Sequence, residues 1–230
     1  KEQPDSPNLP HQLIWLAEIE NRARLHGQAI KHIQEVIEVI RQRTAAISQE
    51  DARANTLREE LQVALETQSA AYRGLKQPDA AITAAQEGLR VAQQGGTETM
   101  ITRALAALAG AQEGAGHLEE AWQLHHQIYE NHAAHNASYK NRLDDLRTMA
   151  QIRQRQGRHQ DALDHARDAW RQTLAEPSSR LEPDYLEYIA DFAFKTWKAV
   201  KAADPTAPPP VELAAWTQAL KPAPTAAPAQ

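Results

Sequence analysis

The sequence predicts an all-α protein whose helices pack in antiparallel pairs. Apolar residues recur at helical spacing along almost all of the 230 residues, and no stretch alternates with the period of a strand. Ala is abundant and aromatic residues make up only 5%, a composition that favours closely packed helices. Most of the 13 Pro lie near the two ends, and the others stand where a helix is expected to begin or end.

Composition excludes several classes of function. The chain has no Cys, which excludes thiolate nucleophiles, iron–sulfur clusters and Cys-ligated zinc. A formal net charge of -5 argues against a general nucleic-acid binder. No apolar run reaches the roughly 18 residues of a membrane span. We therefore expect no nucleic acid, no membrane span and no cofactor.

The chain begins at Lys1 and lacks a signal-like segment, which favours a processed protein or a piece of a longer one. The absence of Cys fits the cytoplasm and the periplasm, and the cytoplasm is slightly favoured. Abundant Ala and Gln are typical of a bacterial chain.

The apolar periodicity and the stop signals divide the chain into successive helices. They are expected at residues 8–25, at 27–46, from a capping-box-like Ser48–Asp51 to near Gly74, from Pro78, after Thr97, and at 117–134, 137–156, 159–175 and 183–202. The loops are short, so neighbouring helices must run antiparallel. The remaining segments are an N-terminal extension at 1–7, a Pro-rich hinge at 204–210, a short helix at 211–220 and a Pro/Ala-rich tail or linker at 221–230.

The second helix of each pair carries the same pattern around one alanine. These alanines are Ala29, Ala81, Ala121 and Ala162, which are 52, 40 and 41 residues apart. Each is followed directly by a large apolar residue, and further packing positions follow at equal offsets. This regularity indicates an internal helical repeat.

The two most complete repeats resemble the tetratricopeptide repeat (TPR). Their motif residues are Leu105, Leu108, Ala109, Gly116 and Ala121 in one, and Leu146, Met149, Ala150, Gly157 and Ala162 in the other. The Gly five residues before the key Ala allows a sharp turn, and the small Ala allows the helices to cross closely. The period exceeds the usual 34 residues or so and resembles the longer-helix variety, as in kinesin light chains or the sensor domains of some bacterial transcription activators.

The resemblance covers roughly residues 8–175 and implies a right-handed α-solenoid. The repeat around Ala81 has Lys76 at the position of the turn Gly. The weakest repeat, around Ala29, has Arg24 there. The repeat domain is expected to span 8–203, with about four helix pairs and an aromatic closing helix at its end.

The resemblance also implies a concave groove lined by particular first-helix positions. Carried onto this sequence, those positions are Glu66, Arg73, Arg103, Glu113, Asp144, Arg147, Gln151, Gln154 and Arg155. A polar groove with Arg forks suits carboxylates or peptide backbone. The leading hypothesis is therefore a non-catalytic adaptor or scaffold that binds a peptide or protein. The alternatives are a ligand- or peptide-sensing regulatory domain of a larger bacterial regulator and a helical accessory domain of an enzyme.

No catalytic or metal site is predicted. The acidic pairs Glu59-Glu60, Glu119-Glu120 and Asp144-Asp145 are adjacent on helices, where neighbouring side chains point about 100° apart and cannot face one another. Four His lie close in sequence, but no third ligand completes a set, so packing is preferred to metal binding; they are His125, His126, His132 and His135.

Trp216 lies in the short helix after the Pro-rich hinge. A short isolated helix is unstable in water, which favours docking of this helix back onto the solenoid. The other interpretation is that Trp216 makes a secondary contact with a partner.

Overall fold

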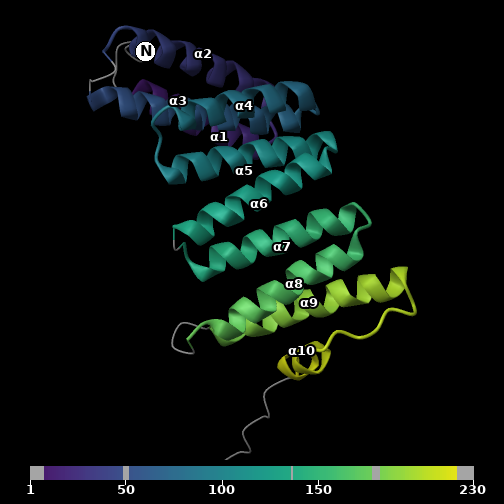
Figure 1. Cartoon of the computed structure of the whole chain (residues 1–230). Helices are drawn as coiled ribbons and strands as arrows, with labels where there is room; N and C mark the ends of the chain where they lie inside the picture. The colour runs from purple at the N-terminus through teal and green to yellow at the C-terminus, as the bar shows by residue number, and fades with distance from the viewer. Residues whose placement is uncertain (1–7, 49–51, 136, 178–181, 222–230) are drawn as a thin grey trace, which may run out of the picture. The chain divides into compact units, whose positions relative to one another are not determined.

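The computed structural model describes residues 8–48, 52–135, 137–177 and 182–221, and all regular structure within these ranges is helical (Figure 1). The helices are α1 (Leu9–Arg22), α2 (His26–Ala45), α3 (Ala52–Gly74), α4 (Pro78–Gln93), α5 (Glu98–Ala115), α6 (Leu118–Ala134), α7 (Tyr139–Arg155), α8 (His159–Ala175), α9 (Pro183–Ala203) and α10 (Leu213–Ala219). The predicted all-α class is confirmed. In the described ranges, none of these helices combines the length and the apolar character needed to cross a membrane.

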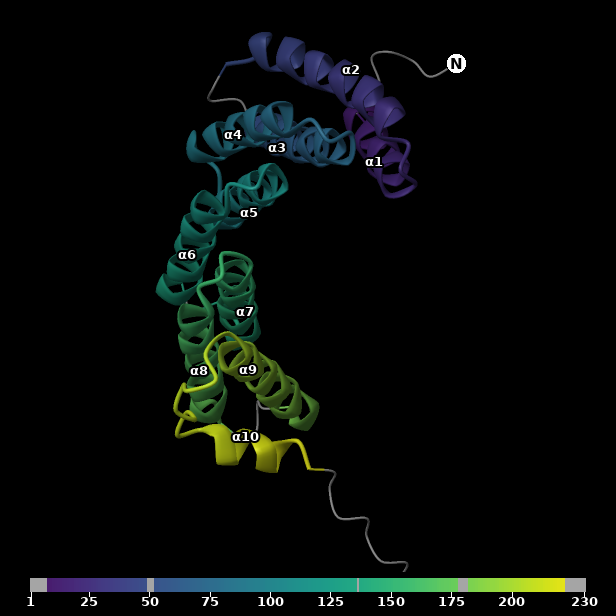
Figure 2. The same ribbon diagram turned by 90° about the vertical axis from the view of Figure 1, so that its right-hand side faces the viewer.

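The chain divides into two compact units, residues 1–128 and 129–230, and each is described by itself. In unit 1, consecutive helices from α1 to α5 pack against each other, and α3 also contacts both α1 and α5. The first helices α1, α3 and α5 therefore form one layer, and α2 and α4 each pack against two of them (Figure 2). In unit 2, α8 packs between α7 and α9, and α10 packs on α9.

Each unit has an apolar core of its own. The core of unit 1 includes Ile33, Val36, Ile40, Ala64 and Leu65. The core of unit 2 includes Leu143, Leu146, Leu163, Trp170, Ile189, Trp197 and Trp216. Helix α9, which was predicted to close the stack, is thus itself covered by α10.

The helix boundaries agree with the prediction except at a few ends. Helix α1 ends at Arg22 and not near residue 25, because Arg24 has a positive φ of 63° that ends the helix. The predicted extension at 1–7, the Asp51 side of the capping box and the tail beyond residue 221 lie outside the described residues. A single repeat domain over 8–203 stays a prediction.

The loop inside each helix pair has the same backbone conformation. The residue five positions before the key alanine is left-handed in all four repeats: Arg24 (φ 63°), Lys76 (57°), Gly116 (84°) and Gly157 (74°). In each loop the next N–H donates to the carbonyl five residues earlier, as in a Schellman ending; these pairs are Leu25–Glu20, Gln77–Tyr72, His117–Gln112 and Arg158–Arg153. The two repeats that lack the turn Gly therefore make the same turn as those that have it.

The four key alanines are equally uniform. Ala29, Ala81, Ala121 and Ala162 are all completely buried, with 0% of their surface exposed. Each N–H donates to the carbonyl four residues earlier, so each lies in the first turn of its helix. A buried small residue at the start of every second helix is what the repeat predicted.

Because the turn residue is left-handed in every repeat, introducing Gly there and removing Gly there should change the free energy of unfolding in opposite directions. A left-handed residue with a Cβ costs roughly 1–2 kcal/mol, whereas Gly adds about 0.5–1 kcal/mol of chain entropy to the unfolded state. Lys76→Gly is therefore expected to raise the free energy of unfolding by about 0.5–1 kcal/mol, and Gly157→Ala to lower it by about 1 kcal/mol. Urea denaturation followed by circular dichroism measures both changes.

Gly27 provides the matched control for this series. It lies in the first turn of α2, its φ is not left-handed, and an added Cβ would meet nothing within 4 Å. An added Cβ at Gly157 also meets nothing within 4 Å, so the two sites differ in backbone conformation and not in available space. Gly27→Ala should therefore stabilise the chain through helix propensity. Equal signs for Gly27→Ala and Gly157→Ala would contradict the argument.

Candidate functional site

The predicted groove residues all lie on first helices and divide between the two units. Glu66 and Arg73 are on α3 and Arg103 and Glu113 on α5, all in unit 1. The α7 residues of unit 2 are Asp144, Arg147, Gln151, Gln154 and Arg155. Each half of the prediction is therefore considered within its own unit.

In unit 1, two of the predicted groove charges bind each other. Arg103 Nη2 donates to Glu66 Oε2 at 2.8 Å, which joins α5 to α3. The second oxygen of Glu66 accepts from Gln62 Nε2 at 2.8 Å, and the same amide lies 2.6 Å from the Met100 carbonyl oxygen. This network links α3 to α5, with the Glu66 carboxylate largely buried and the Arg103 side chain half-exposed.

The other two unit 1 residues are also engaged with α5 and α6. Arg73 crosses the small-residue surface of α5, and a Cβ at Gly110 would lie only 2.8 Å from Arg73 Nη1. The Gly is therefore what allows the guanidinium to lie this close to the helix. Glu113 Oε1 lies 3.5 Å from His125 Nε2 on α6.

In unit 2, the predicted residues lie along α7, and one of them bonds to α9. Gln154 Nε2 donates to Thr196 Oγ1 at 3.2 Å, which links α7 to α9. Arg147 Nε lies 3.5 Å from the exposed Asp144 carboxylate, an ion pair without a hydrogen bond. That buried Nε has no hydrogen-bond partner among the described residues. Gln151, one turn further along α7, is exposed.

Three tyrosines complete this face, and the groove prediction did not include them. Tyr139 on α7 meets Tyr185 on α9 edge-on, with ring centroids 5.9 Å apart, and Tyr188 lies 5.6 Å from Tyr185. The hydroxyl of Tyr185 is buried without a hydrogen-bond partner in the described part of the chain. The concentration of aromatic residues in 185–197 was the available signal; it was interpreted as a closing helix and came second to the Arg-lined groove as a place for a partner.

The Tyr185 phenol lies close enough to charged residues of α7 for them to change its pKa. Burial raises the pKa of Tyr185 to about 12, and the negative charge of Asp144 acts in the same direction. The Arg147 guanidinium lowers this pKa, although by less. Tyr185 is therefore a neutral hydroxyl at physiological pH, able to donate one hydrogen bond and to accept others. We call the surface formed by Asp144, Arg147, Gln151, Tyr185 and Tyr188 the α7–α9 face.

The four clustered His have separate partners. His125 lies by Glu113, the His126 ring is 5.2 Å from the Trp122 ring, and His132 Nδ1 is 2.6 Å from Asp145 Oδ2. His135 Nδ1 is 3.0 Å from the Asn131 carbonyl oxygen. Over the ranges that the structure describes, no three His, Cys, Asp or Glu converge as a metal site would require.

Trp216 docks onto unit 2, as the favoured interpretation predicted. Its side chain is completely buried in the core, and the start of α10 is fixed by Glu212, whose oxygens accept from Arg167 Nε and Arg171 Nη2 at 3.0 Å each. Burial alone would raise the pKa of Glu212, but hydrogen bonds from Arg167, from a backbone N–H and from Arg171, together with the charge of Arg167, hold this pKa below its ordinary value. A partner could contact Trp216 only if α10 left this core, and Trp216 as a secondary partner contact stays a prediction.

No family model and no curated protein matches the sequence, whereas several solved structures share its fold. A kinesin-light-chain-like protein of Podosopora anserina with nearly identical TPR-like repeats is 15% identical, with a TM-score of 0.67 and 95% of each chain covered. BtubC (BKLC) from P. vanneervenii is 13% identical, with a TM-score of 0.63 and coverage of 96% of this chain and 85% of that one.

The apo form of RapI is 11% identical to this chain, with a TM-score of 0.62; the match covers 86% of this chain but only 52% of RapI. Similarity at these identities establishes the fold. Together with the four equivalent turns and buried alanines, it shows that the chain is a TPR-like helical repeat protein with an all-α solenoid fold.

Proposed function

We propose that the chain is a non-catalytic interaction module and that the α7–α9 face binds an extended peptide segment of a partner protein. The observation that carries the proposal is the grouping on one face of the exposed Asp144, Gln151 and Tyr188 side chains with the half-buried Arg147 guanidinium, whose Nε lies 3.5 Å from Asp144 without a hydrogen bond. An acceptor, a donor, an amide and an aromatic ring are thus all accessible to a partner on the same surface. Two buried polar atoms lie beside them, Arg147 Nε and the Tyr185 hydroxyl, which lack hydrogen-bond partners among the described residues.

The chemistry of the face suits a peptide main chain. Asp144 accepts hydrogen bonds, Arg147 donates them and the Gln151 amide does both, which matches the alternating N–H and C=O groups of an extended backbone. Tyr185 and Tyr188 add large, rigid rings that lose little entropy on binding. Helices held by their neighbours present these groups already in position, which reduces the entropic cost of association.

Tyr185→Phe separates the proposed binding role from a structural role. The Tyr185 hydroxyl has no partner among the described residues, so its removal should leave the free energy of unfolding unchanged or slightly higher. Tyr129→Phe is the matched control, because the Tyr129 hydroxyl accepts from Gln172 Nε2 at 2.7 Å and its loss should cost about 1 kcal/mol. A destabilising Tyr185→Phe would show that the hydroxyl is already used in the free protein.

Peptide selection tests the proposal directly. Peptides selected from a random display library on the wild-type chain are measured by fluorescence anisotropy against Arg147→Met, which keeps the apolar stem and removes every donor. We expect an affinity loss of about tenfold or more, since loss of a desolvated charged donor typically costs 2 kcal/mol or more. Arg90→Met is the control, because Arg90 also belongs to an exposed i,i+3 pair, with Glu87 on α4 in unit 1.

The same measurements contain the outcomes that would reject the proposal. Selected peptides that bind wild type, Arg147→Met and Tyr185→Phe equally would place the binding site elsewhere. Turnover of a substrate by the purified chain would reject the non-catalytic assignment.

A further inference from the structure

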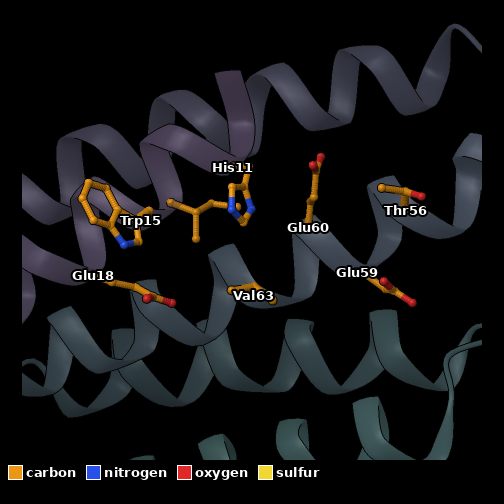
Figure 3. Close-up of a pocket in the computed structure, with 8 residues that line it drawn as sticks. His11, Trp15, Glu18, Thr56, Glu59, Glu60 and Val63 are labelled. Carbon is orange, nitrogen blue, oxygen red and sulfur yellow. The ribbon is translucent and has the colours of Figure 1, made fainter. Parts of the chain in front are cut away.

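A cavity of about 320 Å³ lies between α1 and α3 in unit 1, apart from every residue of the predicted groove. Ile14, Trp15 and Val63 form apolar parts of its wall. Its remaining lining residues are polar or charged, namely His11, Glu18, Thr56, Glu59 and Glu60. Figure 3 shows the indole of Trp15 at one end of this group and the Glu60 and Thr56 side chains toward the other.

Trp15 is unusual among the tryptophans of this chain. It is 62% exposed, whereas Trp216, Trp170 and Trp197 are buried in the core of unit 2. Its neighbour Ile14 is buried in the core of unit 1, so α1 is anchored and presents the indole on a fixed helix. An exposed indole at the edge of a hollow offers a large apolar face and a ring quadrupole, both of which favour contact with a cation or an apolar group.

The charges around the cavity favour a cation over an apolar group as its occupant. Three of its lining residues are carboxylates, and among the described residues that line it only His11 can carry positive charge. Glu18 contacts Arg22 at 3.6 Å, a pair in which the Arg is 80% exposed and which therefore contributes little. Burial raises the pKa of Glu60 despite opposing effects of Arg43 and His11, so this carboxylate is poorly compensated where it stands.

We propose that the α1–α3 cavity binds one cationic side chain, Arg or Lys, projected from a partner protein. The apolar stem of such a side chain packs along Trp15, Ile14 and Val63, while its charged head reaches Glu59 and Glu60 toward the other end of the cavity. A cavity of this size is at the lower end for small-molecule sites and accommodates a single long side chain. The proposal does not depend on the α7–α9 face.

The test uses the full chain labelled with 5-fluorotryptophan, with the Trp15 resonance assigned through Trp15→Phe. The probes are the acetylated and amidated tripeptides Gly-Arg-Gly, Gly-citrulline-Gly and Gly-Leu-Gly. Citrulline has nearly the shape of Arg but no charge. We expect the Arg peptide to shift the Trp15 resonance with millimolar affinity, and the citrulline and Leu peptides to bind at least threefold more weakly.

Carboxylate variants identify the source of the selectivity. Glu59→Gln is expected to weaken binding of the Arg peptide at least threefold and to leave the citrulline peptide unchanged. Glu35→Gln, at an exposed position of α2 outside the cavity, makes the same change in net charge and should have no such effect.

Three results would overturn the proposal. Citrulline or Leu peptides that bind as well as the Arg peptide would make this a site for neutral side chains. Equal losses in Glu59→Gln and Glu35→Gln would mean that only net charge matters. A Trp15 resonance that no peptide moves would mean that the cavity binds none of these side chains.

Discussion

Trp216→Ala is expected to lower the free energy of unfolding of unit 2 by about 3–5 kcal/mol, the usual cost of truncating a large buried side chain. The indole is completely buried and belongs to the same core as Leu163, Trp170 and Ile189. Removing it opens a cavity in that core. It also removes the main apolar contact of α10, a seven-residue helix that is too short to be stable alone.

Urea denaturation followed by circular dichroism and tryptophan fluorescence measures the effect. Val211→Ala is the control in the same segment, because Val211 is 86% exposed and its truncation should change stability by less than about 0.5 kcal/mol. A loss below about 1 kcal/mol for Trp216→Ala would show that unit 2 does not need α10.

Helix α9 was predicted to close the stack, but α10 packs on it and completes the unit 2 core. Helix α9 contributes Ile189, Ala193 and Trp197 to the unit 2 core, and their spacing of four residues places them on one side of the helix. It packs on α8, and α10 covers it after the Pro-rich segment 204–210. The sequence predicted a short helix near 211–220 and its docking, but it did not show that this helix would pack on α9.

The fold was largely predictable because it depends on local signals that repeat. Four alanines at equivalent offsets marked the helix crossings, and two Gly marked two of the turns. Arg24 and Lys76 carried no such signal, since a left-handed conformation at a non-Gly residue is imposed by the packing of the flanking helices. The tertiary structure thus decides the turn where the residue type does not.

The candidate site was predictable only in part, because it depends on pairings between helices. The repeat pattern correctly placed Glu66 and Arg103 on first helices, but it could not show that the two side chains bind each other across α3 and α5. In the same way, Arg147 and Tyr185 are 38 residues apart in sequence and act on each other only because α7 and α9 are brought together. The sequence predicted where each charged residue lies on its helix, but it did not predict which residue each of them binds.

Ala162→Leu is the second change for which we expect a large effect, a loss of about 1–3 kcal/mol in the free energy of unfolding. Ala162 is completely buried at the start of α8, immediately after the left-handed turn at Gly157 that brings α8 back along α7. Three added carbon atoms cannot be accommodated there without separating the two helices. Interiors are close-packed, so the strain passes to neighbouring side chains.

Ala202→Leu in α9 is the control, because that alanine is exposed and the change should alter stability by less than about 0.5 kcal/mol. Ala121→Leu tests whether the cost belongs to the repeat position, since Ala121 is equally buried at the start of α6. Small and equal effects at Ala162, Ala121 and Ala202 would mean that close helix crossing is not required.

The same substitution connects the repeat geometry to the proposed function. The α7–α9 face depends on the position of α7, which is packed against α8, and α8 in turn is packed against α9. A larger residue at Ala162 should displace α7 from α9 and separate Arg147 from Tyr185. Peptide affinity should therefore fall in Ala162→Leu under conditions where the variant is still fully folded, whereas Ala121→Leu in unit 1 should reduce stability and leave that affinity unchanged.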